Sequence, residues 1–375
     1  MSRAPHLVVD ISPHGFGHAA MTMPVLSALV QCHPGLRLTV RAGAPHAWLR
    51  PQLPVGTSLL PTAPDLGMAM HHALGVDVPA SMRWYRALFA EWDRHLGDAA
   101  AALVALEADA VLSNVGFLPL AAAAHAGIPA AAFCCLNWAD VLAHYASAEA
   151  DCGALVAWLR ALYGAADVFL APAPSMPMDW LPNRVAVPPV ARLGRDCRQA
   201  LRRRLGASED DRVVLLSLGG VAFPVDVSLW PALPGVKVVA GMPVMGAHPQ
   251  VYPAADLQMS WIDLLASSDA VLTKPGYGTV TEAACNGIPV LYLPRQDWPE
   301  EPHLLAWLRQ HGRCGEVPRE ALAQGRFHTF LPGLLSQPSP LRPRPNGVRQ
   351  TAVHLADWLR GRRPLPAGNS GVMPQ

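Results

Sequence analysis

The run LTKPGYGTVTEAACNGIPVLYLPR, residues 272–295, contains in order the end of a strand, a turn, a helix and a second strand. The first apolar stretch stops at Lys274, and a proline with two glycines forms the turn. A helix is expected to begin near Thr279, and the apolar stretch 289–294 predicts the next strand. This order predicts a parallel pair of strands joined by a crossover helix.

The same alternation continues on both sides of this run. Further strands are predicted at 6–11, 37–42, 110–115, 129–135, 167–172, 212–220, 236–241 and 270–275. Helices are predicted at 18–33, 81–107, 117–127, 151–164, 261–268, 278–287, 301–311 and 348–360. Because the strands are almost continuously apolar, we expect parallel sheets that are covered by helices on both faces.

The length of 375 residues predicts two domains. The segment 188–208 is rich in proline and arginine and precedes a strand that restarts the alternation, so we place the boundary there. We expect an N-terminal Rossmann-like domain over 1–195, a C-terminal one over 196–360 and a flexible tail over 361–375. The two halves would face each other across a cleft.

Composition narrows the class of protein. The chain is 51% hydrophobic and 15% charged with a net charge of +1, so we expect large cores and no nucleic-acid partner. The seven cysteines include no Cys-x-x-Cys pair, which predicts a reduced, cytoplasmic protein. Asp10 and His14 interrupt any signal-peptide pattern, and prolines break the apolar run 115–136, so neither a leader nor a membrane span is expected.

The glycine-rich turn of the opening run is the first candidate site. Gly276 and Gly278, on either side of Tyr277, allow a ligand to approach the backbone closely, and free N–H groups at a helix start bind anions. Thr279 adds a hydroxyl group. Glu282 fits two interpretations: a capping box with Thr279, which is purely structural, or a carboxylate that accepts hydrogen bonds from two ribose hydroxyls.

Two more loops follow predicted strands of the same half, where ligands of open α/β sheets bind. The loop 294–303 concentrates charge in a chain with little charge, and its candidate residues are Arg295, Glu300 and Glu301. The loop 217–223 contains Gly219 and Gly220, which we interpret as a turn that touches phosphate. A solvated loop and an ordinary turn are the alternative interpretations.

The N-terminal half has its own candidate in SPHGFGHAAM, residues 12–21, after the first predicted strand. Gly15 and Gly17 permit a tight turn, and His18 lies at the start of a helix. Because the positive end of a helix dipole disfavours a second positive charge, we expect the pKa of His18 to be lowered. A neutral imidazole accepts a proton near pH 7, and His14 is a second candidate for that role. A purely structural loop is the alternative.

These motifs together resemble a known family. The opening run with its extension EEPHLLAWL, the loop SPHGFGHA, and the segments 133–146 and 345–359 are similar to the glycosyltransferase-like half of plant-type L-arabinokinases and to its bacterial stand-alone relatives. More distantly, residues 6–357 resemble GT-B nucleotide-sugar glycosyltransferases, including the MurG-like group. The resemblance implies a GT-B fold, with two Rossmann-like parallel-sheet domains facing a central cleft.

The resemblance also implies roles for single residues. Gly278 and Thr279 would contact phosphate, and Glu282 would bind the ribose. The base would lie near Trp261, and the donor sugar near Glu300 and Glu301. His18 would lie on the acceptor side. The Glu-Glu pair stands where related enzymes carry an Asp-Gln motif, and Ser-Pro precedes His14 where relatives often show glycine or threonine. No segment resembles the phosphate-transfer half of the kinases, so sugar phosphorylation is not expected.

The resulting hypothesis is a metal-independent glycosyltransferase without a cofactor, which moves a sugar from a nucleotide diphosphate sugar, UDP-linked, to a hydroxyl acceptor. The sequence shows no Asp-x-Asp motif, so helix N-termini and backbone donors would stabilise the departing diphosphate, assisted by Lys274 and Arg295. His18 would deprotonate the acceptor. The alternatives are a nucleotide-sugar 2-epimerase that uses Glu300 and Glu301, and a noncatalytic nucleotide-sugar-binding protein.

The acceptor is a small molecule, a glycan or a lipid-linked group, and peripheral contact with a membrane is left open. The segment 70–96 is expected to line its pocket. The aromatic residues Trp84 and Tyr85 in that segment fit either the acceptor site or a helix core.

Overall fold

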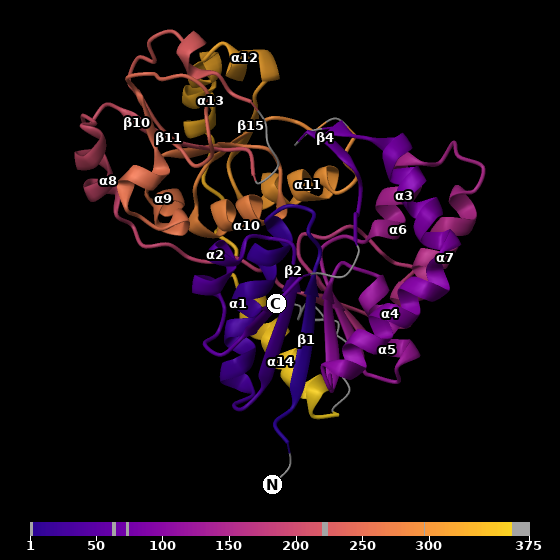
Figure 1. Cartoon of the computed structure of the whole chain (residues 1–375). Coiled ribbons are helices and arrows are strands. Elements are labelled where there is room, and N and C mark those ends of the chain that lie inside the picture. The colour runs from indigo at the N-terminus through magenta and orange to yellow at the C-terminus, as the bar shows by residue number, and fades with distance from the viewer. Residues whose placement is uncertain (1–2, 62–64, 73–74, 220–223, 296, 362–375) are drawn as a thin grey trace, which may run out of the picture.

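The computed structural model describes residues 3–61, 65–72, 75–219, 224–295 and 297–361. Two parallel β-sheets form the centres of two lobes (Figure 1). A short antiparallel pair, β4 (Met70–His72) and β5 (Gly75–Val76), lies outside both sheets. No described helix combines the length and apolarity needed to cross a bilayer.

The first sheet has seven strands in the order β3-β2-β1-β6-β7-β8-β9. Its strands are β1 (His6–Ile11), β2 (Arg37–Ala42), β3 (Ser58–Leu60), β6 (Ala110–Asn114), β7 (Ala130–Phe133), β8 (Val168–Pro172) and β9 (Arg184–Val187). The helices of this half are α1 (Gly17–Cys32), α2 (His46–Leu49), α3 (Val78–Ala90), α4 (Trp92–Ala105), α5 (Leu118–His125), α6 (Trp138–Tyr145) and α7 (Cys152–Gly164). Every residue of β1 is buried, as helices on both faces require.

The second sheet has six strands in the order β12-β11-β10-β13-β14-β15. Its strands are β10 (Arg212–Ser217), β11 (Val236–Ala240), β12 (Val251–Pro253), β13 (Ala270–Thr273), β14 (Val290–Tyr292) and β15 (Cys314–Glu316). The helices that follow the first half are α8 (Arg198–Leu205), α9 (Trp261–Ser267), α10 (Tyr277–Asn286), α11 (Glu301–His311), α12 (Arg319–Ala323), α13 (Leu331–Leu335) and α14 (Gly347–Leu359). Val214 and Leu216 face one core, and Val213 and Leu215 face the other, because side chains alternate along a strand.

The strand order reverses direction at one place in each sheet. The chain moves outward from β1 to β2 on one side and continues from β6 on the other, and β10 and β13 stand in the same relation in the second sheet. Loops diverge above such a pair of strands, and this opening is where ligands of α/β sheets bind. The loops after β1, β6, β10 and β13 therefore surround the expected site.

Helix α14 crosses back to the first lobe (Figure 1). It packs against α1, and its residues Ala352 and Leu355 are completely buried in the core of the first half. Trp358 Nε1 donates a hydrogen bond to Asp167 Oδ2 at 3.0 Å, at the start of β8. A helix within the range expected for the second domain therefore completes the first lobe. The boundary near residue 195 stays a prediction.

The predicted helix over 81–107 is two helices, α3 and α4, separated at Glu91. Of the aromatic residues expected near the acceptor, Tyr85 is fully buried and its hydroxyl donates to the Gly67 carbonyl at 2.9 Å. Tyr85 therefore belongs to the core. The expected tail lies outside the described residues beyond Gly361.

Candidate active site between the two sheets

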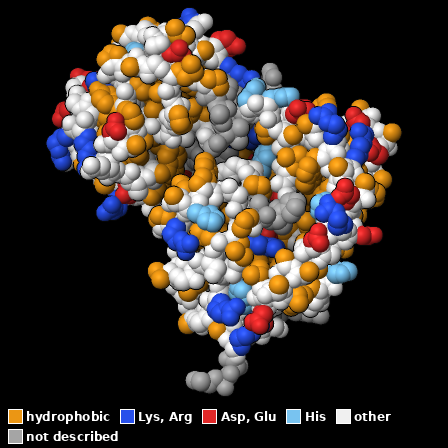
Figure 2. Space-filling model, in the orientation of Figure 1, with side chains coloured by type: hydrophobic (Ala, Val, Ile, Leu, Met, Phe, Trp, Pro, Cys, Tyr) orange, Lys and Arg blue, Asp and Glu red, His pale blue; other side chains and the backbone are white. Residues whose placement is uncertain are grey.

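Side chains from the loops of the two halves are in contact, and Figure 2 shows that the surface is hollowed between the lobes. Helices α1 and α10 are in contact. The ring of His14, after β1, stacks on the ring of Trp298 in the loop after β14, with 5.8 Å between centroids and planes 5° apart. Cys135, after β7, donates its thiol hydrogen to Glu300 Oε1 at 3.1 Å. The structure thus brings the first-loop histidines together with the charged loop.

His18 is held by Asn114, a residue that the sequence analysis did not identify. The two atoms His18 Nδ1 and Asn114 Oδ1 lie 2.9 Å apart at the carboxyl end of β6. The Asn114 amide nitrogen donates to Thr22 Oγ1 at 2.7 Å, and Thr22 in turn donates to the His18 carbonyl at 2.8 Å. This network fixes the Asn114 oxygen toward the ring, so neutral His18 carries its proton on Nδ1 and has Nε2 as its basic nitrogen.

The pKa of His18 is raised, so the expectation of a lowered pKa was wrong. Burial acts to lower the pKa, but contacts with Cys134, whose Sγ lies 3.8 Å from Nδ1, and with Asn114 raise it overall. The expectation took only the helix dipole into account. The neighbouring side chains have the larger effect on the pKa of His18. A base with a higher pKa binds the proton of an acceptor more strongly.

His14 lies in an aromatic setting. Its ring makes an edge contact with the Trp138 ring at 5.1 Å, in addition to the Trp298 stack. Burial and the positive charges nearby lower the pKa of His14 to about 3. His14 is therefore neutral at physiological pH and a weak base, and the geometry favours His18 as the proton acceptor.

Two basic side chains lie near His14: Lys274, which is half-buried, and Arg295, which is buried. Lys274 follows β13, and burial, with Arg295 nearby, lowers its pKa to about 7. Burial also lowers the pKa of Arg295, whose guanidinium lies 4.0 Å above the Trp298 ring and whose Nε has no hydrogen-bond partner among the described residues. Burial raises the pKa of Glu301 to about 7, and this carboxyl accepts from the Arg295 backbone N–H at 3.0 Å. Lys274 and Arg295 together can bind an anion.

Gly219, from the third loop, lies beside Lys274. Its φ of +84° is a conformation that favours glycine, and a Cβ there would lie 3.0 Å from Lys274 Cε. Gly15 likewise has a φ of +80° in the first loop. Gly220, also expected at the site, lies outside the described residues.

The first turns of α1 and α10 are both free of side-chain caps. The N-cap residues are Phe16 and Gly276, and neither helix start receives a side-chain hydrogen bond. Apart from the chain neighbours and the backbone of the helix itself, no atom of the described residues lies within 4 Å of where a Cβ would stand at Gly17 or Gly278. Backbone N–H groups at such starts are suited to phosphate.

Glu282 does not form the capping box with Thr279. Its Oε1 accepts from Arg192 Nε at 2.6 Å and its Oε2 accepts from Trp261 Nε1 at 3.1 Å. The predicted base and ribose residues, Trp261 and Glu282, therefore lie in direct contact.

Tyr277 and Thr279 occupy different settings in the first turn of α10. The Tyr277 hydroxyl donates to the Ala173 carbonyl at 3.0 Å and accepts from the Val190 N–H at 2.9 Å, which ties α10 to the first half. Thr279 is half-buried.

Sequence reasoning missed Asn114, Cys134, Trp138, Arg192 and Trp298. Asn114 and Cys134 each end or follow an apolar strand, and a polar group at that position of a parallel sheet is the signal that would have found them. Trp298 lies inside the charged loop that was identified. Arg192 lies in the segment between the halves, and nothing in the local pattern marks it.

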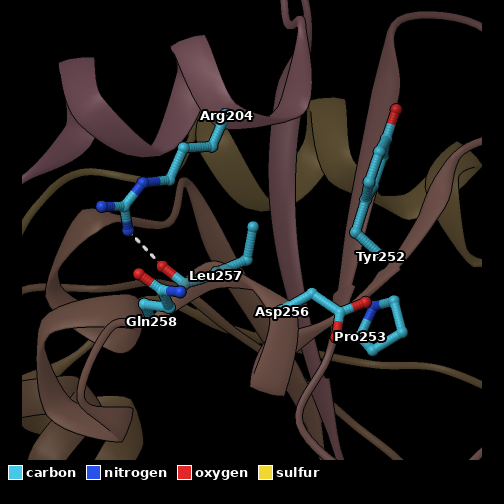
Figure 3. A pocket seen from close by; sticks show the side chains of 6 residues that line it. All are labelled: Arg204, Tyr252, Pro253, Asp256, Leu257 and Gln258. Atoms are coloured by element: carbon cyan, nitrogen blue, oxygen red, sulfur yellow. Dashed lines mark hydrogen bonds between the residues drawn. The ribbon is translucent and has the colours of Figure 1, made fainter.

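The described residues contain no group of three or more His, Cys, Asp or Glu side chains that could hold a metal ion. A cavity of about 370 Å³ lies elsewhere, between α8 and β12. Figure 3 shows its lining, where Arg204 donates to the Leu257 carbonyl beside Gln258, and Tyr252 lies on the opposite side. None of the predicted site residues lines this cavity.

Comparison by sequence confirms the expected resemblance, although no family model matches the chain. L-arabinokinase of Arabidopsis thaliana is 29% identical over 343 residues, which is 87% of this chain and 32% of that protein. An uncharacterized glycosyltransferase of Methanopyrus kandleri is 30% identical over 138 residues, 35% of this chain and 40% of that protein. The chain therefore spans about a third of the first relative, and the alignment covers two fifths of the second.

Comparison by structure confirms the GT-B fold. The glycotransferase of kitacinnamycin superimposes with a TM-score of 0.61 and 19% identity, covering 97% of this chain and all of that one. Phytolacca americana UGT2, solved with UDP-2fluoro-glucose and pterostilbene, gives a TM-score of 0.56 and 14% identity, with 95% of each chain covered. The two parallel-sheet lobes thus have the GT-B fold.

Proposed function

We propose that this chain is a glycosyltransferase that moves a sugar from a UDP-linked donor to a hydroxyl acceptor without a metal ion. The observation that carries the proposal is the contact between α1, which carries His18, and α10, two helices with uncapped starts, together with the charges of Lys274 and Arg295 near His14. The similar fold of UGT2, a protein solved with a UDP-sugar analogue and a phenolic compound, supports the choice of donor class.

The donor half supplies stabilisation of the leaving group. When the bond between the sugar C1 and the diphosphate oxygen breaks, negative charge develops on the diphosphate. The backbone N–H groups of Gly278 and Thr279 meet that charge at the start of α10, and half-buried Lys274 and buried Arg295 add positive charge. Glu282 and Trp261 hold the ribose and base.

The acceptor half supplies the base. His18 Nε2 takes the proton of the acceptor hydroxyl as its oxygen forms the new bond to C1, and the diphosphate leaves with the electron pair of the broken bond. Asn114 accepts the hydrogen of Nδ1 and so keeps Nε2 directed at the acceptor. General-base assistance of this kind contributes about 10²–10⁴ in rate.

Calorimetric titration with UDP tests the donor site. We expect micromolar binding that Glu282→Ala abolishes and that EDTA leaves unchanged. Binding that requires magnesium would contradict the metal-independent mechanism. Mass spectrometry of products from a panel of nucleotide sugars then identifies the donor sugar, and the acceptor is found by offering hydroxyl compounds of different classes.

A 2-epimerase is the second candidate, because the pKa of buried Glu301 is raised to about 7, in the range that acid–base catalysis uses. Incubation with UDP-N-acetylglucosamine and no acceptor separates the two activities, since an epimerase turns over and a transferase does not. A noncatalytic nucleotide-sugar-binding protein would bind UDP and give no product in either assay.

A further inference from the structure

The segment that connects the two halves, residues 188–195, lies along α10. The Val190 carbonyl accepts from Thr281 Oγ1 at 3.1 Å, in the first half of the helix. Gly194 N–H donates to Asn286 Oδ1 at 3.0 Å, at the end of the helix, and the Asn286 amide donates back to the Arg192 carbonyl at 3.0 Å. The connecting segment is thereby fixed to the helix that carries Gly278 and Glu282.

Arg192 extends this attachment to the candidate ribose carboxylate. Its Nε donates to Glu282 Oε1 at 2.6 Å, while Trp261 Nε1 donates to Oε2 at 3.1 Å. The Glu282 side chain is only 9% exposed, whereas that of Arg192 is 33% exposed. Each carboxylate oxygen accepts more than one hydrogen bond, so both remain able to accept from a diol. Two donors from two separate elements thus hold the carboxylate in one orientation.

We infer that Arg192 is a positioning residue for the nucleoside, acting through Glu282, and the inference rests on the proposed function. A buried carboxylate without a cationic partner is costly, and it turns toward whatever donor is nearest. With Arg192 in place, the two oxygens stay aligned for the 2′- and 3′-hydroxyls. Because Arg192 belongs to the connecting segment, the binding of the ribose by Glu282 depends on how that segment packs against α10.

Calorimetric titration with UDP and with 2′-deoxy-UDP tests the inference on the full chain. We expect the wild type to bind UDP about tenfold more tightly than 2′-deoxy-UDP, as a hydrogen bond to a charged group provides. Arg192→Ala is expected to weaken UDP binding about tenfold and to lose this preference. Arg192→Lys keeps the positive charge and secures folding, and it should also lose the preference because lysine lacks the Nε donor.

Arg195→Ala is the matched control. Arg195 lies in the same segment and pairs with Asp263 Oδ2 on α9 at 2.9 Å, but its side chain is 84% exposed, and among the described residues its ion pair is with Asp263 and not with Glu282. This variant should keep the preference for UDP. In addition, when Glu282→Gln is already present, adding Arg192→Ala should not weaken UDP binding any further. The reason is that the two residues act as one unit.

The outcomes separate the inference from the function on which it rests. If Arg192→Ala binds both nucleotides as Arg195→Ala does, the inference is overturned while the transferase proposal stands. If the double variant loses affinity beyond Glu282→Gln alone, Arg192 does not act through Glu282 and the inference is again overturned. Failure of the wild type to bind UDP at all would overturn both.

Discussion

His18 keeps its orientation through neighbours that are distant in sequence. Asn114 and Cys134 come from two other strands, β6 and the end of β7, and both lie against the same ring nitrogen. The ring is buried, and only 8% of the residue is exposed. A histidine whose Nδ1 is held in this way presents Nε2 as its free basic nitrogen, which suits a general base.

Replacing His18 by alanine is expected to lower kcat about 10²–10⁴-fold, the usual contribution of a general base. The dissociation constant for UDP should change little, because His18 lies on the acceptor half. Steady-state kinetics and calorimetry measure the two quantities. His125→Ala, an exposed histidine at the end of α5, is the control and should be neutral in both. Activity of the His18 variant close to that of the wild type would exclude His18 as the base.

The pH profile gives a second prediction for this residue. Only neutral His18 accepts a proton, so kcat/KM should rise with pH through the pKa of His18. Because that pKa is raised, the midpoint should lie above the ordinary value of 6.5. Asn114→Asp should move the midpoint higher, since a carboxylate favours the charged imidazolium, while Asn114→Ala should move it lower.

Rate measurements between pH 5 and pH 9 on the three proteins check this order. A midpoint that is the same in all three would show that Asn114 does not act on His18.

The candidate residues that the sequence revealed are those whose chemistry is local. Gly278 and Thr279 follow a strand and open a helix, and that arrangement alone predicts an anion site. The partners of Glu282 and His18 could not be predicted, because Arg192 and Asn114 are brought to them by the packing of separate elements. The raised pKa of His18 depends on neighbouring side chains of this kind, so it could not be predicted from the sequence either.

At the scale of elements, a substitution at the start of α10 is expected to affect UDP binding and protein stability in opposite ways. Gly278 lies in a helix, has open space where a Cβ would stand, and does not adopt a positive φ. Alanine favours a helix over glycine by about 0.8–1 kcal/mol. Gly278→Ala should therefore keep or raise the melting temperature, yet weaken UDP binding because the new methyl group occupies the space for phosphate.

Gly97→Ala in α4 is the matched control for this variant, since Gly97 is another helical glycine whose Cβ position meets, outside its own helix, no atom of the described residues within 4 Å. It should raise the melting temperature in the same way and leave UDP binding unchanged. Unaltered UDP binding by Gly278→Ala would place the phosphate elsewhere.

The long elements could be predicted from the sequence, and several short ones could not, although the three-residue strand β14 was predicted at 289–294. Strands such as β1 and β10 are continuous apolar runs, and the sequence predicts their existence and approximate ends. Strands β12 and β15 have only three residues each and lie at the two edges of the second sheet. Helix α6 was missed because its eight residues follow β7 after a short turn. Tertiary pairing, rather than local pattern, defines such elements.

At the scale of the whole molecule, α14 joins the two lobes. Leu355 is fully buried against the first half, so Leu355→Ala should lower the free energy of unfolding by about 2–5 kcal/mol. Val353→Ala, on the same helix but 40% exposed, should change it by less than about 0.5 kcal/mol. Denaturant unfolding measures both, and equal effects would mean that α14 does not depend on this packing.

The return of α14 also has a consequence for synthesis in the cell. The ribosome makes α1 early, but the helix that covers it is among the last segments of this chain to emerge. At about 5–20 residues per second, the interval is on the order of tens of seconds. During that time the apolar surface of the first lobe that α14 later covers is exposed to solvent. Chaperones that shield such surfaces should therefore associate with the nascent chain until residue 359 has left the exit tunnel.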